Sequence, residues 1–388
     1  MKLDKKTKYA CVAKTLKGME QPLLKELTEL GYSNLRTRKR AVEFEADLEG
    51  IYRANLELRT ALSVLVNIAM FNFKDDKDIY NEVSRIAWGD IFNPRKTFAI
   101  QHSVFGDVFR NTMYPALVVK DAIADRFRSK YKERPNIDRE RPDVIVDVYI
   151  FDNRCIISLN SSGMPLYKRG YRGLMTFPAP LNEVLAAGMV ALSEWDVRED
   201  FFNPMCGSGT LIVEAAMKAY NIQAGYLRDE FAFMNWSTFD KEEFEKLRRD
   251  PEGAVKKSKA RLMGSDISRR ALSITSHSLN LYHLGDKVEL KRQDFMKATT
   301  GEGKGVLILN PPYGERLEVE DIEMFYKTMG DNLMNHYSNY RPWILSANEE
   351  ALQYVNLKSV EKYELMNGDL PCKYICYDLK AGHKVIEA

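Results

Sequence analysis

The chain has 388 residues, of which 45% are hydrophobic and 29% are charged, with a formal net charge of +2. This length favours two or three globular domains with substantial cores, and the near-neutral charge by itself favours no particular partner. No apolar run approaches the roughly 20 residues that a membrane span needs, so no membrane association is expected.

The opening residues lack a long apolar region, so neither a signal peptide nor a transit peptide is expected. The five cysteines are scattered singly, which suits a reduced compartment better than a disulfide framework. They are Cys11, Cys155, Cys206, Cys372 and Cys376. The expected location is therefore the cytoplasm. No metal site is expected, because Cys372 and Cys376 have no matching histidine pair.

Up to about residue 165, the hydrophobic periodicity predicts short strands and helices in mixed order. Strands are predicted at 8–13, 41–46 and 96–104, and helices at 19–30 and 114–132; segment 51–71 begins helical and becomes β-branched. Residues 144–162 read as a hairpin that turns at Asp152 and Asn153. This part of the chain is therefore predicted to form one or two small α+β domains.

From about residue 175, strands alternate with helices, which predicts a mostly parallel sheet. The predicted strands are 200–206, 261–267, 288–295, 305–310 and 341–348, and the predicted helices are 208–220, 269–282 and 321–337. Two closely spaced strands, 358–368 and 372–379, predict an antiparallel hairpin at the end of the sheet. The charged, aromatic insertion at 221–260 is expected to be helical cover.

Two stretches concentrate basic residues. Residues 126–141, RFRSKYKERPNIDRER, hold seven Lys or Arg and three acids, and residues 165–173, PLYKRGYRG, interleave basic residues with tyrosines. Cations beside aromatic rings suit a phosphate backbone with unstacked bases. The alternative for either stretch is a solvated face with a linker.

The segment FNPMCGSGT, residues 202–210, is predicted to be a strand, a glycine turn and a helix. Gly207 and Gly209 permit close approach of a ligand to the backbone, and the helix that follows offers free N–H groups. The segment lacks the spacing of a dinucleotide fingerprint and the lysine of a phosphate-binding loop. Cys206 in this turn is interpreted as a packing residue.

Acidic residues follow the next two predicted strands. Asp266 ends one strand, where a carboxylate can bind ribose hydroxyls, and Asp294, with Phe295, ends the next. In open α/β sheets, ligands bind outside the carboxyl ends of the strands, so these residues are expected to share one site. The alternative for Asp266 is a helix cap near Ser268.

The segment LILNPPYGERL, residues 307–317, ends the fourth predicted strand abruptly at Asn310. Pro311 and Pro312 hold the backbone rigid and extended, so the Asn310 side-chain oxygen and the Pro311 carbonyl can accept both hydrogens of an exocyclic amino group. Tyr313 can stack on the face of the base. This geometry suits an amine nucleophile that attacks an electrophilic methyl group; the alternative is a simple turn.

These motifs, in this order, resemble class I S-adenosylmethionine-dependent methyltransferases that act on exocyclic amino groups. Residues 175–196 resemble the preceding motif of that family, which helps to enclose the methionine end of the cofactor. The whole chain is similar to bacterial large-subunit (23S) rRNA guanine-N2 methyltransferases with a ferredoxin-like segment and a THUMP domain.

The resemblance implies an α/β fold: a class I, Rossmann-like methyltransferase sheet with a terminal antiparallel hairpin, preceded by α+β ferredoxin-like and THUMP domains. The implied boundaries are 1–60 for the ferredoxin-like segment, 61–165 for the THUMP domain, 166–180 for a linker and 181–388 for the methyltransferase domain. RNA, as naked 23S rRNA or a pre-ribosomal particle, is the implied partner, and S-adenosylmethionine is the implied cofactor.

The resemblance also implies residue roles. The implied cofactor residues are Pro180, Leu181, Asn182, Pro204, Met205, Cys206, Gly207, Ser208, Gly209, Thr210, Asp266, Ile267, Asp294, Phe295 and Asn310. The implied catalytic residues are Asn310, Pro311, Pro312 and Tyr313. The expected RNA contacts are Arg126, Arg128, Lys130, Lys132, Lys168, Arg169 and Arg172. Asn203 departs from the family, because many relatives have Asp there, which weakens the expected contact with the amino acid end of the cofactor.

Three rival functions remain. Adenine-N6 methylation of DNA or RNA uses the same NPPY motif, although no groove-reading DNA-binding pattern is present. A noncatalytic RNA-binding module with a decayed enzyme domain is opposed by the intact Asp266, Asp294 and NPPY. Methylation of a protein glutamine amide leaves the basic stretches without a role.

Overall fold

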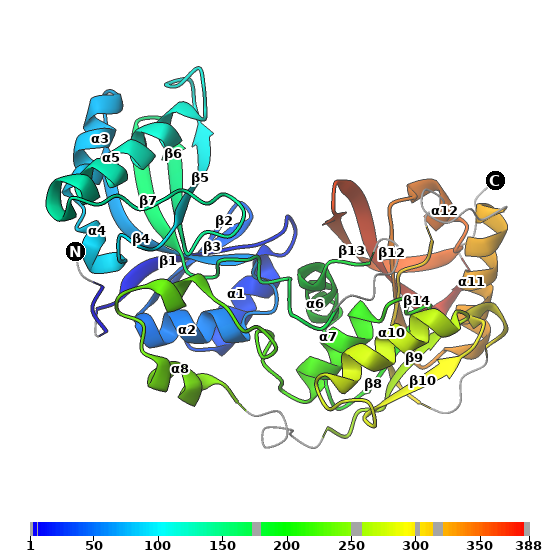
Figure 1. Ribbon diagram of the computed structural model, residues 1–388. Helices are drawn as coiled ribbons and strands as arrows, with labels where there is room; N and C mark the ends of the chain where they lie inside the picture. Colours follow the sequence, from blue (N-terminus) through cyan, green and yellow to red (C-terminus); the bar gives the residue numbers. More distant parts are fainter. Residues whose placement is uncertain are drawn as a thin grey trace. The chain divides into compact units, whose positions relative to one another are not determined.

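Two seven-stranded sheets organise the protein, and each is the framework of one unit (Figure 1). The computed structural model describes residues 3–5, 7–172, 180–249, 258–298, 303–312 and 321–383. The first unit comprises residues 1–15, 23–168 and 228–248, and the second unit comprises residues 16–22, 169–227 and 249–388.

The sheet of the first unit has the strand order β2-β3-β1-β4-β7-β6-β5. Its strands are β1 (Tyr9–Lys14), β2 (Ser33–Arg38), β3 (Ala41–Ala46), β4 (Ser63–Asn72), β5 (Phe98–Phe105), β6 (Val144–Phe151) and β7 (Arg154–Asn160). Its helices are α1 (Glu20–Glu29), α2 (Leu48–Glu57), α3 (Asp76–Arg85), α4 (Trp88–Ile91) and α5 (Tyr114–Tyr131). All its strand pairs are antiparallel except β5 with β6.

Most elements of the first unit agree with the prediction, including the hairpin of β6 and β7. Asp152 at its turn has a φ of 51°, a left-handed conformation that Asp tolerates. Strand β2 and helices α3 and α4 were not predicted. One hydrophobic core joins the ferredoxin-like and THUMP parts, since β4 pairs with both β1 and β7.

The sheet of the second unit has the strand order β10-β9-β8-β11-β12-β14-β13. Its strands are β8 (Asp200–Pro204), β9 (Leu262–Asp266), β10 (Val288–Arg292), β11 (Gly305–Leu309), β12 (Tyr340–Ser346), β13 (Leu357–Asn367) and β14 (Leu370–His383). Its helices are α6 (Glu183–Leu192), α7 (Thr210–Ala219), α10 (Arg269–Asn280), α11 (Ile322–His336) and α12 (Glu349–Gln353). The predicted α/β fold class, with its parallel sheet and terminal antiparallel hairpin, is confirmed.

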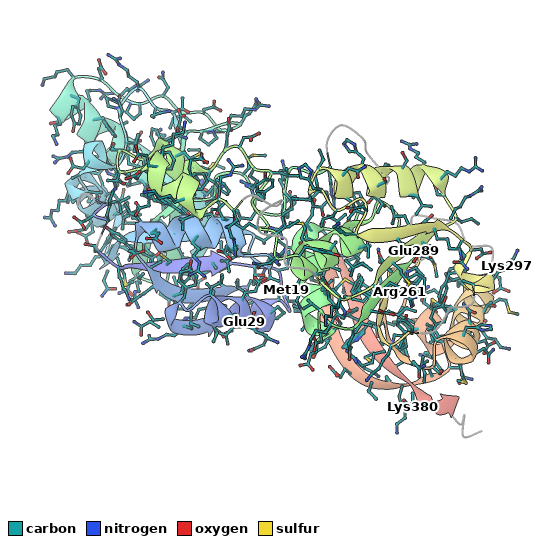
Figure 2. All side chains as sticks on the ribbon, turned by 90° about the horizontal axis from the view of Figure 1, so that it is seen from below. Met19, Glu29, Arg261, Glu289, Lys297 and Lys380 are labelled. Carbon is teal, nitrogen blue, oxygen red and sulfur yellow. The ribbon has the colours of Figure 1, made fainter. Side chains whose placement is uncertain are left out.

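A close contact at α6 and an ion pair at the start of β8 stabilise the second unit. A Cβ atom on Gly188 of α6 would lie 1.9 Å from the Met19 sulfur, so a larger residue there would displace the Met19 side chain. Figure 2 labels Met19 beside this region, and it labels Arg261, whose guanidinium pairs with Asp200 at 3.0 Å at the start of β8. This ion pair lies at the edge of the sheet opposite the strand ends that form the site below.

The insertion divides between the two units. Its segment from Arg228 to Arg248 belongs to the first unit and contains the short helices η1 (Ala232–Asn235) and α8 (Lys241–Leu247). The Arg228 guanidinium donates to the carbonyls of Pro165 and Lys168, each at 2.9 Å. Aromatic rings of this segment pack against Tyr52 of α2, including Phe233 at 4.5 Å between centroids. The insertion thus contributes aromatic rings to the core of the first unit, and its Arg228 binds backbone carbonyls at the end of that unit.

Candidate active site

The carboxyl ends of four parallel strands bring the predicted cofactor and target residues to one edge of the second sheet. Strand β8 pairs in parallel with β9 on one side and β11 on the other, and β10 pairs in parallel with β9. The chain runs from β8 to β9 on one side and returns to β11 on the other, so β8 and β11 flank the point where strand order reverses. Open α/β sheets bind ligands at this point.

The glycine turn follows β8 directly. Met205, Gly207 and Gly209 all have positive φ, and a Cβ atom on Gly209 would lie 2.4 Å from Cγ2 of Thr275. The Thr275 hydroxyl donates to the Gly207 carbonyl at 3.1 Å, which fixes the turn from α10. In this turn Met205, Gly207 and Ser208 are half-buried, whereas Pro204, Cys206, Gly209 and Thr210 are buried. Burial raises the pKa of the Cys206 thiol to about 12, so the thiol is protonated at neutral pH.

Asp266 ends β9 and holds the glycine turn. Its Oδ2 accepts from the Gly207 N–H at 2.8 Å, and its Oδ1 accepts from the Ser268 N–H at 2.8 Å. Ser268, not Asp266, caps α10, since the Ser268 hydroxyl accepts from the Ala271 N–H. Asp266 is half-buried and Ile267 is 64% exposed, so this strand end reaches the surface of the unit.

Asp294 follows β10 and caps the short helix η2 (Phe295–Lys297), accepting from the Met296 N–H at 3.0 Å. Phe295 is only 2% exposed, and its ring packs against Tyr337 with centroids 5.5 Å apart. The Phe295 carbonyl accepts from the Asn332 amide at 2.6 Å. The half-buried Asp294 carboxylate also lies 3.9 Å from the Lys297 ammonium, whereas the Phe295 ring is a core group.

Asn310, Pro311 and Pro312 follow the fully buried strand β11. Asn310 and Pro312 are half-buried, and Pro311 is buried. The Tyr326 hydroxyl donates to the Pro312 carbonyl at 3.5 Å and contacts Ser346 Oγ at 2.8 Å, which anchors the segment to β12. Tyr313 lies outside the described residues.

Asn203 lies on β8 just before the glycine turn and is 1% exposed. Its amide nitrogen donates to the Ile308 carbonyl of β11 at 2.9 Å, so it links the two strands that flank the site. An Asp side chain has no such donor when ionised. Within the described residues, Asn203 Oδ1 and Ser265 Oγ are buried without a partner, next to the ends of β8 and β9. Buried polar atoms left open at this edge fit a polar ligand.

The segment before α6 lies in the same unit. Pro180 is exposed, Leu181 is 5% exposed, and Asn182 caps α6 by accepting from the Val184 N–H at 2.9 Å. Glu183 is 3% exposed, and burial raises its pKa to about 7, although the nearby Arg172 guanidinium opposes that rise.

The residues predicted to bind RNA have two different environments. In α5, Arg128 and Lys130 are exposed, Arg126 is half-buried, and Lys132 is exposed at the end of the helix. Lys168 is also exposed. Arg169 is 1% exposed and pairs with Glu214 of α7 at 3.3 Å, which contradicts the prediction that it contacts RNA.

The sequence did not point to the helix side chains that hold the site segments in place through tertiary contacts. Thr275, Tyr326 and Glu214 come from helices and carry no motif of their own. Their roles depend on tertiary contacts, so only the helical periodicity around them was visible in the sequence.

Metal-binding clusters and membrane-spanning helices are two further features that a chain of this kind could carry. No group of three or more His, Cys, Asp or Glu side chains that could hold a metal occurs among the described residues. In the same part of the chain, none of the helices has the length and apolar character needed to cross a membrane.

Family models match three parts of the chain. Residues 169–375 match the RMKL-like methyltransferase domain, residues 73–160 match the THUMP domain, and residues 10–65 match the RlmL ferredoxin-like domain. These models cover both the first sheet and the edge of the second sheet described above.

Two relatives match this chain over nearly its whole length. A candidate RNA methyltransferase, slr0064 of Synechocystis sp., is 31% identical over 373 residues, which are 96% of each chain. The ribosomal RNA large subunit methyltransferase K/L of Psychromonas ingrahamii is 34% identical over 96% of this chain. The chain spans about half the length of that K/L relative, 50%.

Two solved structures share the fold over nearly the whole chain. SMU.472, solved in complex with SAH, is 26% identical with a TM-score of 0.84, covering 96% of this chain and 98% of that one. A protein of Listeria monocytogenes described as a predicted N6-adenine-specific DNA methylase is 27% identical with a TM-score of 0.85, covering 96% of both chains.

Proposed function

The chain belongs to the RMKL-like methyltransferases, and on this premise we propose that it methylates the N2 amino group of a guanine in large-subunit (23S) rRNA, with S-adenosylmethionine as cofactor. One observation carries the proposal. The glycine turn, Asp266, Asp294 and Asn310 all follow parallel strands that end at one edge of the sheet. The K/L relatives act on large-subunit rRNA according to their name, and the THUMP match supports an RNA substrate.

The proposed cofactor site is the glycine turn with the two acids. The turn residues from Pro204 to Thr210 receive the amino acid end, Asp266 binds the ribose hydroxyls, and Asp294 binds the adenine amino group. Asp266 already accepts two backbone N–H groups, so its orientation is fixed before a ligand binds. When bound, S-adenosylmethionine supplies a methyl group on a positively charged sulfur, which keeps the electron pair of the broken bond.

The proposed target site is the segment from Asn310 to Pro312, with Tyr313 stacking on the base. The Asn310 side-chain oxygen and the Pro311 carbonyl accept the two amino hydrogens, which directs the nitrogen lone pair toward the methyl group. The displaced proton passes to solvent. The base must leave its stack to reach this edge, and the exposed cations of α5 hold the RNA backbone meanwhile.

The test is nucleoside analysis by mass spectrometry of rRNA and DNA from cells with and without the gene. The purified chain and labelled S-adenosylmethionine should then restore the missing mark. Loss and recovery of N2-methylguanosine in the large-subunit RNA is the expected result. No change in either nucleic acid would contradict the proposal.

Adenine-N6 methylation is the second candidate, and the Listeria structure described as a predicted N6-adenine-specific DNA methylase favours it. The same chemistry at Asn310 serves an adenine amino group. Loss of N6-methyladenine in the same analysis would select this candidate and keep the mechanism.

A further inference from the structure

Arg172 lies beside the proposed cofactor site and uses its guanidinium inside the second unit. Its Nε pairs with Glu183 Oε1 at 2.6 Å, and its Nη2 donates to the Leu181 carbonyl and to the Thr210 hydroxyl, the latter at 3.3 Å. The Arg172 side chain is 34% exposed, whereas the Glu183 side chain is 4% exposed. The Arg172 side chain therefore contacts two separate segments, residues 181–183 and Thr210.

The anchored groups are the starting points of two helices. Leu181 directly precedes Asn182, the cap of α6, and Thr210 is the first residue of α7, immediately after the glycine turn. The two hydrogens of Nη2 hold both starting points while Nε pairs with Glu183, whereas a lysine has a single nitrogen for all three partners.

The neighbouring residues have the same inward orientation. Arg169 pairs with Glu214 one turn into α7, and the Tyr171 hydroxyl donates to the same Glu214 carboxylate at 3.5 Å. Arg169, Tyr171 and Glu214 are each 1% exposed. Acidic partners therefore bind the guanidinium groups of Arg169 and Arg172 inside the unit, whereas Lys168 of the same stretch is exposed.

We propose that Arg172 is a positioning residue of the cofactor site, holding the start of α6 against the glycine turn through Leu181, Glu183 and Thr210. This inference rests on the proposed function, because it assigns the cofactor to that turn. Loss of the Arg172 contacts should let the two helix starts separate. The ordering of both segments would then be needed at each binding event, which lowers affinity for the cofactor.

The experiment measures SAH affinity by calorimetry in the full-length chain, with R172K and R172A. Both variants should raise the Kd for SAH by about tenfold or more, with lysine failing to rescue because its one nitrogen cannot replace both Nε and Nη2. The salt dependence of binding to purified large-subunit rRNA should stay unchanged in both. A matched control, L365A, removes a buried side chain on the edge strand β13, distant in the sheet from β8.

The outcomes separate the alternatives. An unchanged Kd for SAH together with a flatter salt dependence would overturn the proposal and make Arg172 an RNA contact. An equal rise of the Kd in L365A would overturn it as well, by attributing the effect to general destabilisation. Failure of the wild-type chain to bind SAH would instead overturn the proposed function on which the inference rests.

Discussion

Two basic stretches of similar composition have opposite environments. Near the end of α5, Arg128 has a side chain that is 59% exposed and pairs with its helix neighbour Asp125. In the second stretch, Arg169 is buried and pairs with Glu214, 45 residues away in sequence. Local composition therefore shows where basic residues lie along the chain. Whether a basic side chain is exposed or buried depends on its acidic partner, which can be distant in sequence.

The largest effect expected from this contrast is a loss of stability in R169A. Removing one partner of a buried ion pair leaves the other charge uncompensated, so the free energy of unfolding should fall by about 3–5 kcal/mol. R128A should change it by less than about 1 kcal/mol, because exposed pairs contribute little. Urea denaturation of both variants measures the difference. Equal, small losses would show that Arg169 is not a structural cation.

D266A removes a carboxylate that accepts hydrogen bonds from the backbone of the second unit. The variant loses the acceptor of the Gly207 and Ser268 N–H groups as well as the proposed ribose contact. The affinity for SAH should fall by about 1–3 kcal/mol, as for an unsatisfied hydrogen-bonding group. D266N keeps one acceptor oxygen and should lose less. Calorimetry that finds the affinity of D266A unchanged would remove Asp266 from the cofactor site.

The smallest expected effect concerns the exposed stretch. Replacing Arg126, Arg128, Lys130 and Lys132 by Ala should flatten the dependence of RNA affinity on salt. The slope should change by about 0.7–0.9 for each phosphate that the variant no longer neutralises. Binding to large-subunit rRNA at several salt concentrations measures it. If the slope stays the same, α5 is a solvated face and its contrast with the second stretch loses its functional meaning.

The sequence predicted elements whose hydrophobic pattern was strong. Strand β11 is buried at every position, and the hairpin of β13 and β14 was visible from two strands joined by a short turn. Strand β2 was missed because five of its six residues are exposed. In helix α3 only Ile79 and Val83 are buried; they have the four-residue spacing of a helix face, but two apolar positions make a short pattern that was missed.

The sequence likewise predicted some residues of the site but not others. Residues immediately after strands, such as Asp266 and Asn310, were predictable because parallel strand ends meet at one edge. The role of Asn203 as a link to Ile308 could not be predicted, since it depends on the register between β8 and β11. The anchoring of Pro312 by Tyr326 likewise depends on how α11 packs.

In the proposed site, the ends of β8 to β10 hold the cofactor, and the end of β11 holds the target amino group. The most direct measurement compares N310A with the wild-type chain in turnover on RNA and in SAH affinity. N310A should lose about 10²- to 10³-fold in turnover, as on removal of one positioned polar group at a reacting centre, with SAH affinity almost unchanged. Equal losses in turnover and affinity, or an unchanged turnover, would contradict this division of roles.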